Sequence, residues 1–258
     1  MQIDKKNILK SLNSQPYFHI ISNFYKNQES KKFKKETLNF ARLFGKIRFQ
    51  DKKKNNILEI KANTKKINNL KKNKKKIKTV LRYHQTNLGG SIHSDGPQLN
   101  IPPKYLIMSC QNNSENGGDS IITNAKKIYE YLKKKDRKNF KELTNKFYFE
   151  RRGYNFSKQN IFKKPIFYKK GKKFIFRYLR DYINKAYYLK KIILSKKQQN
   201  ALNNLDKLLK DKKFAIKFKL NKGDLIILNN HVLAHGRTAF KIAKKNNTIR
   251  KLYRVWAN

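Results

Sequence analysis

Apolar residues recur at helical spacing in three segments of the chain, residues 35–46, 125–146 and 195–211. Gly45 is placed to end the first of these helices, and Ser195 is placed to cap the start of the third. We therefore expect three amphipathic helices, the first near the amino end and the other two in the second half of the chain.

Shorter runs rich in β-branched and aromatic residues predict strands between and after these helices. They lie near residues 57–60 and at 104–111, 119–124, 146–151, 164–169, 173–179, 214–220, 223–230 and 248–258. Many short strands with a few inserted helices favour a barrel or a jelly roll. A parallel doubly wound sheet would need a strict alternation of strand and helix, which this pattern lacks.

The composition supports one folded domain over residues 1–258. Hydrophobic residues make up 38% of the 258 positions and aromatic residues 12%, which is enough for a core. No Gly/Pro/Ser-rich linker divides the chain, and the Lys/Asn-rich stretch at 61–78 is predicted to be a surface loop. Cys110 stands alone in the sequence, which excludes an internal disulfide and a thiolate metal cluster. The chain also lacks a membrane-length apolar run and a secretory leader pattern, so the cytoplasm is the expected compartment.

The formal net charge of +48 permits two interpretations. Lysine and arginine bind nucleic-acid phosphates by releasing counterions, so a nucleic-acid partner is one of them. The other is a bias towards A/T-rich codons, since Lys, Asn and Ile are enriched together and the lysines are spread along the chain. We favour the second interpretation and expect a small-molecule partner, no membrane and no nucleic acid. The sequence does not indicate an oligomeric state.

Candidate chemistry begins at His93 and Asp95 in the glycine-bounded stretch GGSIHSDGPQ. In an extended segment this spacing puts both side chains on one face. The pair alone is weak evidence, because a site with two histidines and one carboxylate for Fe(II) needs a distant third ligand. His231 and His235, which follow the apolar strand 225–228, are both candidates for that ligand.

Four segments, in this order, resemble the Fe(II)/2-oxoglutarate-dependent dioxygenases of the taurine dioxygenase, γ-butyrobetaine hydroxylase and clavaminate synthase branch. They are HSDGPQLNIPPKYLIMSC, ENGGDSIITNAKKIYEYL, LNNHVLAHGRTAF and RKLYRVW. The resemblance implies a mainly β fold with flanking helices, a double-stranded β-helix (jelly roll). It also implies an enzyme that uses Fe(II), 2-oxoglutarate and O₂ and releases succinate and CO₂.

The same resemblance assigns roles to residues. In the family pattern the second histidine ligand stands five positions after an asparagine, so Asn230 selects His235 over His231 as the third ligand beside His93 and Asp95. Arg250 would hold the far carboxylate of 2-oxoglutarate, for which a bidentate guanidinium suits better than an ammonium. Ser120 would donate a hydrogen bond to the cosubstrate, although it is also interpretable as an ordinary strand residue.

The substrate implied is a small amino-acid-like or carboxylated metabolite, and the retained carboxylate ligand points to hydroxylation, desaturation or ring formation. Arg254 would bind an anionic group of the substrate or pair with a structural carboxylate. Other candidates for the pocket are Tyr83, His84 and Gln98, and also Arg177 and Arg180, for which a structural salt bridge is an equal alternative. Two rival functions remain: a nucleic-acid-directed oxidative demethylase with the same iron chemistry, and a non-catalytic basic binding protein.

Overall fold

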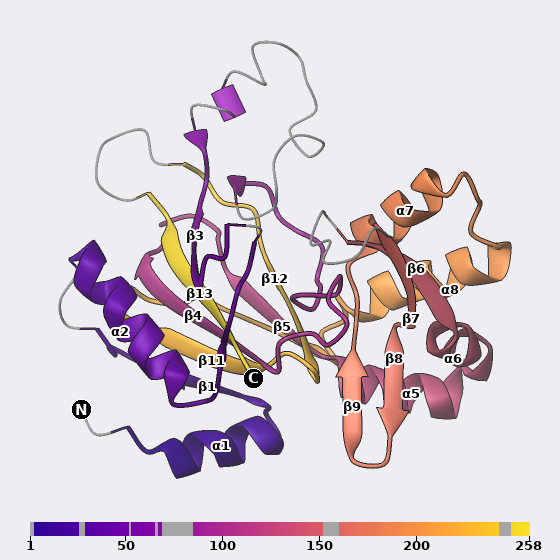
Figure 1. The fold of residues 1–258 in the computed structure, drawn as a ribbon, viewed down its shortest axis with the longest axis horizontal. Helices are drawn as coiled ribbons and strands as arrows, with labels where there is room; N and C mark the ends of the chain where they lie inside the picture. The colour runs from indigo at the N-terminus through magenta and orange to yellow at the C-terminus, as the bar shows by residue number, and fades with distance from the viewer. Residues whose placement is uncertain are drawn as a thin grey trace.

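Two antiparallel sheets form the centre of the molecule in the computed structural model (Figure 1). The structure describes residues 3–25, 29–51, 53–64, 67–68, 85–151, 160–242 and 249–258. The larger sheet has the order β1-β11-β4-β13-β2, with β3 also paired to β13. Its strands are β1 (Phe18–Ile21), β2 (Ile47–Arg48), β3 (Ile57–Lys61), β4 (Tyr105–Asn112), β11 (Leu225–Asn229) and β13 (Lys251–Ala257). The smaller sheet has the order β10-β5-β12, from β5 (Ser120–Asn124), β10 (Ala215–Phe218) and β12 (Leu233–Arg237).

The central strands of the larger sheet are covered on both faces. All five residues of β11 are buried, and β4 is buried at six of its eight positions. Helices α1 (Lys5–Asn13) and α2 (Ser30–Arg42) cover the outer face, where α2 packs on β13 and β4 (Figure 1). Phe33, Phe40 and Tyr253 belong to the apolar cluster between them. The candidate site lies on the inner face.

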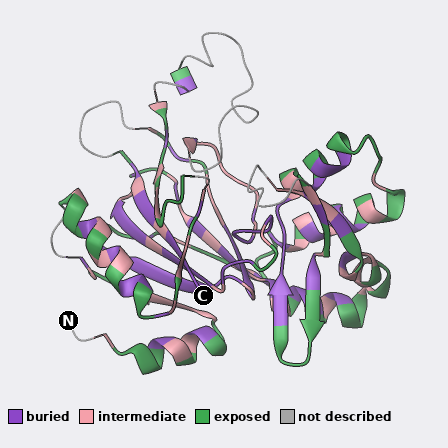
Figure 2. Cartoon of the chain, in the orientation of Figure 1, coloured by how far each residue is buried: buried purple, intermediate pink, exposed green. Residues whose placement is uncertain are grey.

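Four helices and two hairpins form a second region, which we call the helical lobe. Figure 1 shows it beside the sheets, and Figure 2 shows its exposed outer surface. Its elements are α5 (Ala125–Lys135), α6 (Arg137–Thr144), α7 (Arg180–Leu189), α8 (Lys196–Leu208) and the paired strands β6 (Lys146–Glu150), β7 (Ile161–Pro165), β8 (Phe167–Lys170) and β9 (Lys173–Phe176). One buried cluster joins Leu202 and Phe147 of the lobe to Leu106 and Trp256 of the larger sheet. The lobe therefore shares a core with the sheets.

Several predicted elements differ in detail from those in the structure. The helix expected over 125–146 is interrupted at Asp136, whose side chain accepts a hydrogen bond from the backbone N–H of Asn139 and starts α6 anew. The strand expected over 164–169 is divided between β7 and β8. By contrast, α8 begins at Ser195 with the reciprocal capping bonds of a capping box, Ser195 with Gln198. α1, β1, β2 and α7 were not predicted at all. The segment that carries His235 was expected to be a polar loop, but residues 233–237 form β12 (Leu233–Arg237), which pairs with β5.

The thiol of Cys110 lies in β4 and is fully buried. Its Sγ donates to the carbonyl of Leu220 at 3.7 Å, and burial raises the pKa of the thiol to about 12. A buried thiol with a raised pKa is unreactive, because the thiolate is the reactive form. Among the described residues, no helix is long and apolar enough to cross a membrane. Most of the Lys/Asn-rich stretch at 61–78 lies outside the described residues.

Candidate metal centre and pocket

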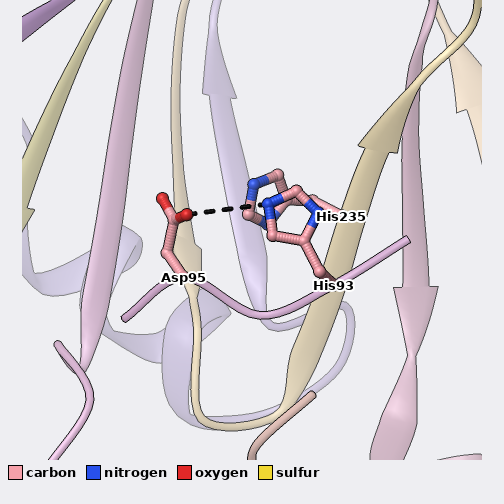
Figure 3. Close-up of side chains that lie close together, drawn as sticks. All are labelled: His93, Asp95 and His235. Carbon is pink, nitrogen blue, oxygen red and sulfur yellow. Dashed lines mark ion pairs between the residues drawn. The ribbon is translucent and has the colours of Figure 1, made fainter. Parts of the chain in front are cut away.

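His93, Asp95 and His235 come together although 140 positions separate the first two from the third. One ligand atom from each lies within 4.8 Å of the other two (Figure 3). His93 and Asp95 come from the loop before β4, and His235 is the middle residue of β12. Asp95 and His235 are buried, and His93 is partly exposed. We call this set the metal-binding group.

Backbone hydrogen bonds hold the loop of His93 in place. The N–H of His93 donates to the carbonyl of His235 at 2.9 Å, and the N–H of His235 donates back at 2.8 Å. Between the two loop ligands, Ser94 is tied to Tyr178: its N–H donates to the Tyr178 carbonyl, and its Oγ accepts from the Tyr178 N–H, both at 3.0 Å. The positions of both histidines are therefore fixed relative to each other by the main chain.

The side chain of Asn230 holds the backbone of Asp95 in place. Its Oδ1 accepts from the N–H of Asp95 at 2.7 Å, and its Nδ2 donates to the carbonyls of Asp95 at 3.0 Å and Pro103 at 2.8 Å. The Asn230 side chain is fully buried. It therefore joins the end of β11 to the loop that carries two of the three candidate ligands.

The carboxylate of Asp95 has a partner on each oxygen. Arg254 Nη1 donates to Oδ1 at 3.0 Å, and Trp256 Nε1 donates to Oδ2 at 2.9 Å. Arg254 is held in turn by its Nε, which donates to Gln50 Oε1 at 2.8 Å. Burial alone would raise the pKa of Asp95, but Arg254 and the nearby imidazoles outweigh it and hold that pKa well below the ordinary carboxyl value. Asp95 is therefore an anion.

The ring nitrogens of the two histidines have different surroundings. Nδ1 of His93 lies 2.8 Å from the carbonyl of Ser91, which can only accept, so Nδ1 donates there and Nε2 is the nitrogen left for a metal. That Nε2 lies 3.7 Å from Oδ1 of Asp95. Burial lowers the pKa of His235 to about 3, so its ring is neutral. Nδ1 of His235 is buried without a hydrogen-bond partner in the described structure. Two imidazoles and one carboxylate on a single face fit a divalent iron.

His231, the alternative third ligand, faces elsewhere. Its Nε2 lies 3.0 Å from the carbonyl of Pro102, and burial lowers its pKa. It is not in the group that includes His235.

The metal-binding group opens into a pocket between the two sheets, and Arg250, Ser120 and Gln98 also line it. Arg250 is 5% exposed, and its Nε donates to Asn113 Oδ1 at 3.0 Å. Burial lowers the pKa of Arg250 to about 10, which still leaves it charged at neutral pH. Gly118 lies against it at a φ of +76°, and a Cβ at this position would stand 3.0 Å from Arg250 Nε. The glycine therefore makes room for the guanidinium.

Arg237 is a pocket residue that the sequence did not single out beyond its place in the motif. Its Nη2 donates to the carbonyls of Thr86 and Leu88, which lead into the loop of His93. Burial lowers its pKa to about 9. The Gly-Arg pair after His235 in the motif could have marked Arg237 as a site residue. Its hydrogen bonds to distant backbone carbonyls could not be predicted from the sequence.

The remaining sequence candidates divide into two sets. Arg180 pairs with Asp206 at 2.9 Å, and Arg177 donates to backbone carbonyls, so the salt-bridge alternative describes Arg180 but not Arg177. Tyr83 and His84 lie outside the described residues. For Arg254 two roles were open, pairing with a structural carboxylate or binding the substrate. Its contacts in the structure are with the Asp95 carboxylate and with Gln50, and it also lines the pocket.

Comparison with known proteins adds a family and a fold. A profile of the taurine catabolism dioxygenase TauD, TfdA family matches residues 24–256. A search of curated proteins finds no match. Among solved structures, an asparagine oxygenase in complex with Fe(II), 2S,3S-3-hydroxyasparagine and succinate superposes with a TM-score of 0.73 at 12% identity, covering 98% of this chain and 78% of its own.

Two further structures are similar. The non-heme iron oxygenase OrfP in complex with Fe and alpha-ketoglutaric acid has a TM-score of 0.65 at 13% identity, with 98% and 78% coverage. A taurine dioxygenase from Burkholderia xenovorans has a TM-score of 0.65 at 14% identity, with 99% and 82% coverage. At these identities the structures establish a shared fold, mostly sheet with helices.

Proposed function

The chain belongs to the taurine catabolism dioxygenase TauD, TfdA family, and from that premise we propose an Fe(II)- and 2-oxoglutarate-dependent oxygenase of small amino-acid-like or carboxylated metabolites. The observation that carries the proposal is the convergence of His93, Asp95 and His235 at a pocket that Arg250 also lines. We further propose that residues 1–258 act as one catalytic domain and that the two sheets are the halves of a double-stranded β-helix.

In this proposal His93, Asp95 and His235 hold Fe(II). When bound, the iron supplies oxygen activation coupled to the oxidative decarboxylation of 2-oxoglutarate to succinate and CO₂. The protein keeps the three ligands in place through the backbone ties and keeps Asp95 ionised through Arg254. Because His235 stays neutral down to low pH, its nitrogen lone pair is available over the whole physiological range.

Arg250 and Ser120 bind 2-oxoglutarate in the proposal. Arg250 is charged and buried, and Asn113 and Gly118 orient it, so a carboxylate in the pocket would meet a preorganised guanidinium. Ser120, the first residue of β5, is 7% exposed and lines the same pocket, and its hydroxyl is proposed to hydrogen-bond a second group of the same ligand. The cosubstrate would then lie between the metal-binding group and Arg250.

The substrate class is proposed from the similar structures and from the residues that line the pocket. The similar structures include an asparagine oxygenase and an oxygenase complexed with (3S)-hydroxy-L-Arg, and both favour an amino-acid-like substrate. Gln98 and Arg254 line the pocket and are proposed to face that substrate. The same role for Tyr83 and His84, which lie outside the described residues, stays a prediction from the sequence. Arg254 would have to leave Asp95, or share its guanidinium, in order to bind an anionic group.

The proposal is tested with protein purified without metal and reconstituted with Fe(II) under anaerobic conditions. Adding 2-oxoglutarate should produce the visible charge-transfer absorption of an iron–2-oxoglutarate complex. Admission of O₂ should then yield succinate, faster with a fitting substrate. The His93→Ala protein should show neither signal. A wild-type protein without the absorption band would contradict the proposal.

A further inference from the structure

Gln98 is a buried polar residue in the pocket whose side chain is incompletely satisfied. It is 3% exposed, and its Oε1 is buried without a hydrogen-bond partner in the described structure. A buried amide oxygen that has lost water and gained no donor is unfavourable, and such groups in native proteins call for an explanation. A ligand that brings a donor into the pocket would remove the deficit.

The loop around Gln98 is held firmly by a buried arginine. Arg177 is 4% exposed, and its Nη1 donates to the carbonyls of Pro97 at 2.6 Å and Leu99 at 2.5 Å, while its Nη2 donates to that of Asn100 at 3.0 Å. These carbonyls lie on both sides of Gln98. The buried Arg177 guanidinium thus fixes the backbone on both sides of Gln98. A binding residue held in place in this way is organised before its ligand arrives.

The charges in the pocket indicate what the ligand would offer. The chain has 64 basic and 16 acidic residues, yet an acidic residue, Asp181 in the first turn of α7, lies at the exposed edge of the pocket. The neighbouring arginines are engaged: Arg237 with carbonyls and Arg254 with Asp95. Both Asp181 and Gln98 Oε1 are acceptors, and they are complementary to N–H donors.

We propose that Gln98 is a specificity-determining residue that accepts a hydrogen bond from a nitrogen of the substrate, and that Arg177 is its positioning residue. The substrate class is then a small molecule bearing an ammonium, guanidinium or carboxamide group. This inference rests on the proposed function, which leaves open carboxylated substrates without nitrogen. It restricts that choice to nitrogen-bearing molecules.

The test measures ligand binding by calorimetry to protein loaded with Fe(II) and 2-oxoglutarate, in the absence of O₂. The ligands are pairs: each L-amino acid with its 2-hydroxy acid, and asparagine and glutamine with aspartate and glutamate. In at least one pair the nitrogen-bearing member should bind at least about tenfold more tightly, since sites built around a hydrogen bond reject analogues that lack it. If no pair shows this preference, the proposal is wrong.

Variants then assign the preference to Gln98. Gln98→Met, of similar volume, should weaken the preferred ligand about tenfold and leave iron affinity unchanged. Gln98→Glu presents only acceptors in either orientation of the group, so it should keep or strengthen the binding of a nitrogen donor. Gln199→Met, on the exposed face of α8, is the matched control and should behave as wild type. A preference that survives Gln98→Met, or is lost in Gln98→Glu, would overturn the assignment.

Arg177→Lys tests the positioning role. Lysine keeps the charge but lacks the planar fork that meets carbonyls on two sides, so KM for the preferred ligand should rise with little change in kcat. A fall in kcat with KM unchanged would contradict that role. Failure of the underlying function is distinguishable, because it would appear as the absence of succinate formation in every protein, whatever the ligand preference.

Discussion

The two sheets and the helical lobe contribute to the pocket in different ways. The sheets and the loop before β4 carry every residue of the metal-binding group, together with Arg250 and Ser120. The lobe carries no member of that group. It supplies Leu179, Asp181 and Tyr182 to the pocket. It also supplies Arg177, which lies just before α7 and holds the loop of Gln98 in place. The iron and 2-oxoglutarate residues thus lie on or beside the sheets, whereas the lobe contributes only to the substrate side of the pocket, together with Gln98 in the loop before β4 and Arg254 in β13.

This division has a physical basis. Metal ligands tolerate little displacement, and paired strands such as β12 and β5 hold side chains in a fixed register. Substrate-facing groups can vary with the helices that carry them, because the sheets keep their hydrogen bonds regardless. Changes on the sheets are therefore expected to affect iron and 2-oxoglutarate, whereas changes in the lobe are expected to affect the substrate or stability only.

The largest effect is expected from Asp95→Ala. The change removes the carboxylate of the metal-binding group and leaves the buried Arg254 and Trp256 donors without their acceptor, so iron binding and succinate formation should both be lost. Wild-type protein should gain thermal stability on addition of Fe(II), by linkage, and the variant should not. Full turnover in the variant would contradict the metal assignment.

Asn230→Ala should weaken iron binding without touching a ligand. It removes the hydrogen bonds that hold the main chain of Asp95, and loss of groups that orient metal ligands typically costs roughly 10- to 100-fold in affinity. Asn229→Ala is a matched control, because Asn229 is also buried but donates to the carbonyl of Leu12 in α1. Equal iron affinities in the two variants, measured by titration, would remove the special role of Asn230.

Arg250→Lys should separate the cosubstrate from the metal. A lysine keeps the charge but loses bidentate contact with a carboxylate, and one charge-assisted hydrogen bond contributes about 1.5–3 kcal/mol, or roughly 10- to 100-fold in binding. KM for 2-oxoglutarate should rise by that factor while iron affinity stays the same. An unchanged KM for 2-oxoglutarate would place its carboxylate elsewhere.

The smallest effect is expected in the lobe, from Tyr178→Phe. The hydroxyl of Tyr178 donates to Asp206 at 2.6 Å, but its backbone, which is tied to Ser94, is unaltered by the change. The free energy of unfolding should fall by about 1.5–3 kcal/mol, as for one hydrogen bond to a charged carboxylate, but iron affinity should be preserved, so the effect on the site is the smallest of the four. A large loss of iron affinity would show that the lobe takes part in the metal centre. It would contradict the division of roles between the sheets and the helical lobe.

The sequence predicted the parts of the site that depend on local spacing. His93 and Asp95 are two apart, and the expected strands over 104–111, 119–124 and 223–230 match β4, β5 and β11 closely. The family and its reaction class were recognisable from the same motifs, because these motifs combine ligands with the turns that present them.

Contacts between residues that are far apart in the chain could not be predicted from the sequence. The contact of Arg254 with Asp95 depends on the register between β13 and β4 and on Gln50, 204 positions away, so the two roles of Arg254 stayed open. Arg177 gives no local signal either, because its partners are backbone carbonyls that any residues would provide. The break at Asp136 was missed because the apolar spacing continues across it, and only the cap shows where one helix ends.

The buried thiol in β4 has a practical consequence for optical and magnetic-resonance work. Cys110 stands alone in the sequence, is fully buried and has a pKa of about 12, so maleimides at neutral pH should leave the native protein unlabelled. A cysteine introduced at Asp181 would then be labelled selectively in the natural background, with no residue removed from the core. A dye or spin label there would report the arrival of a ligand at the edge of the pocket directly, independent of any turnover.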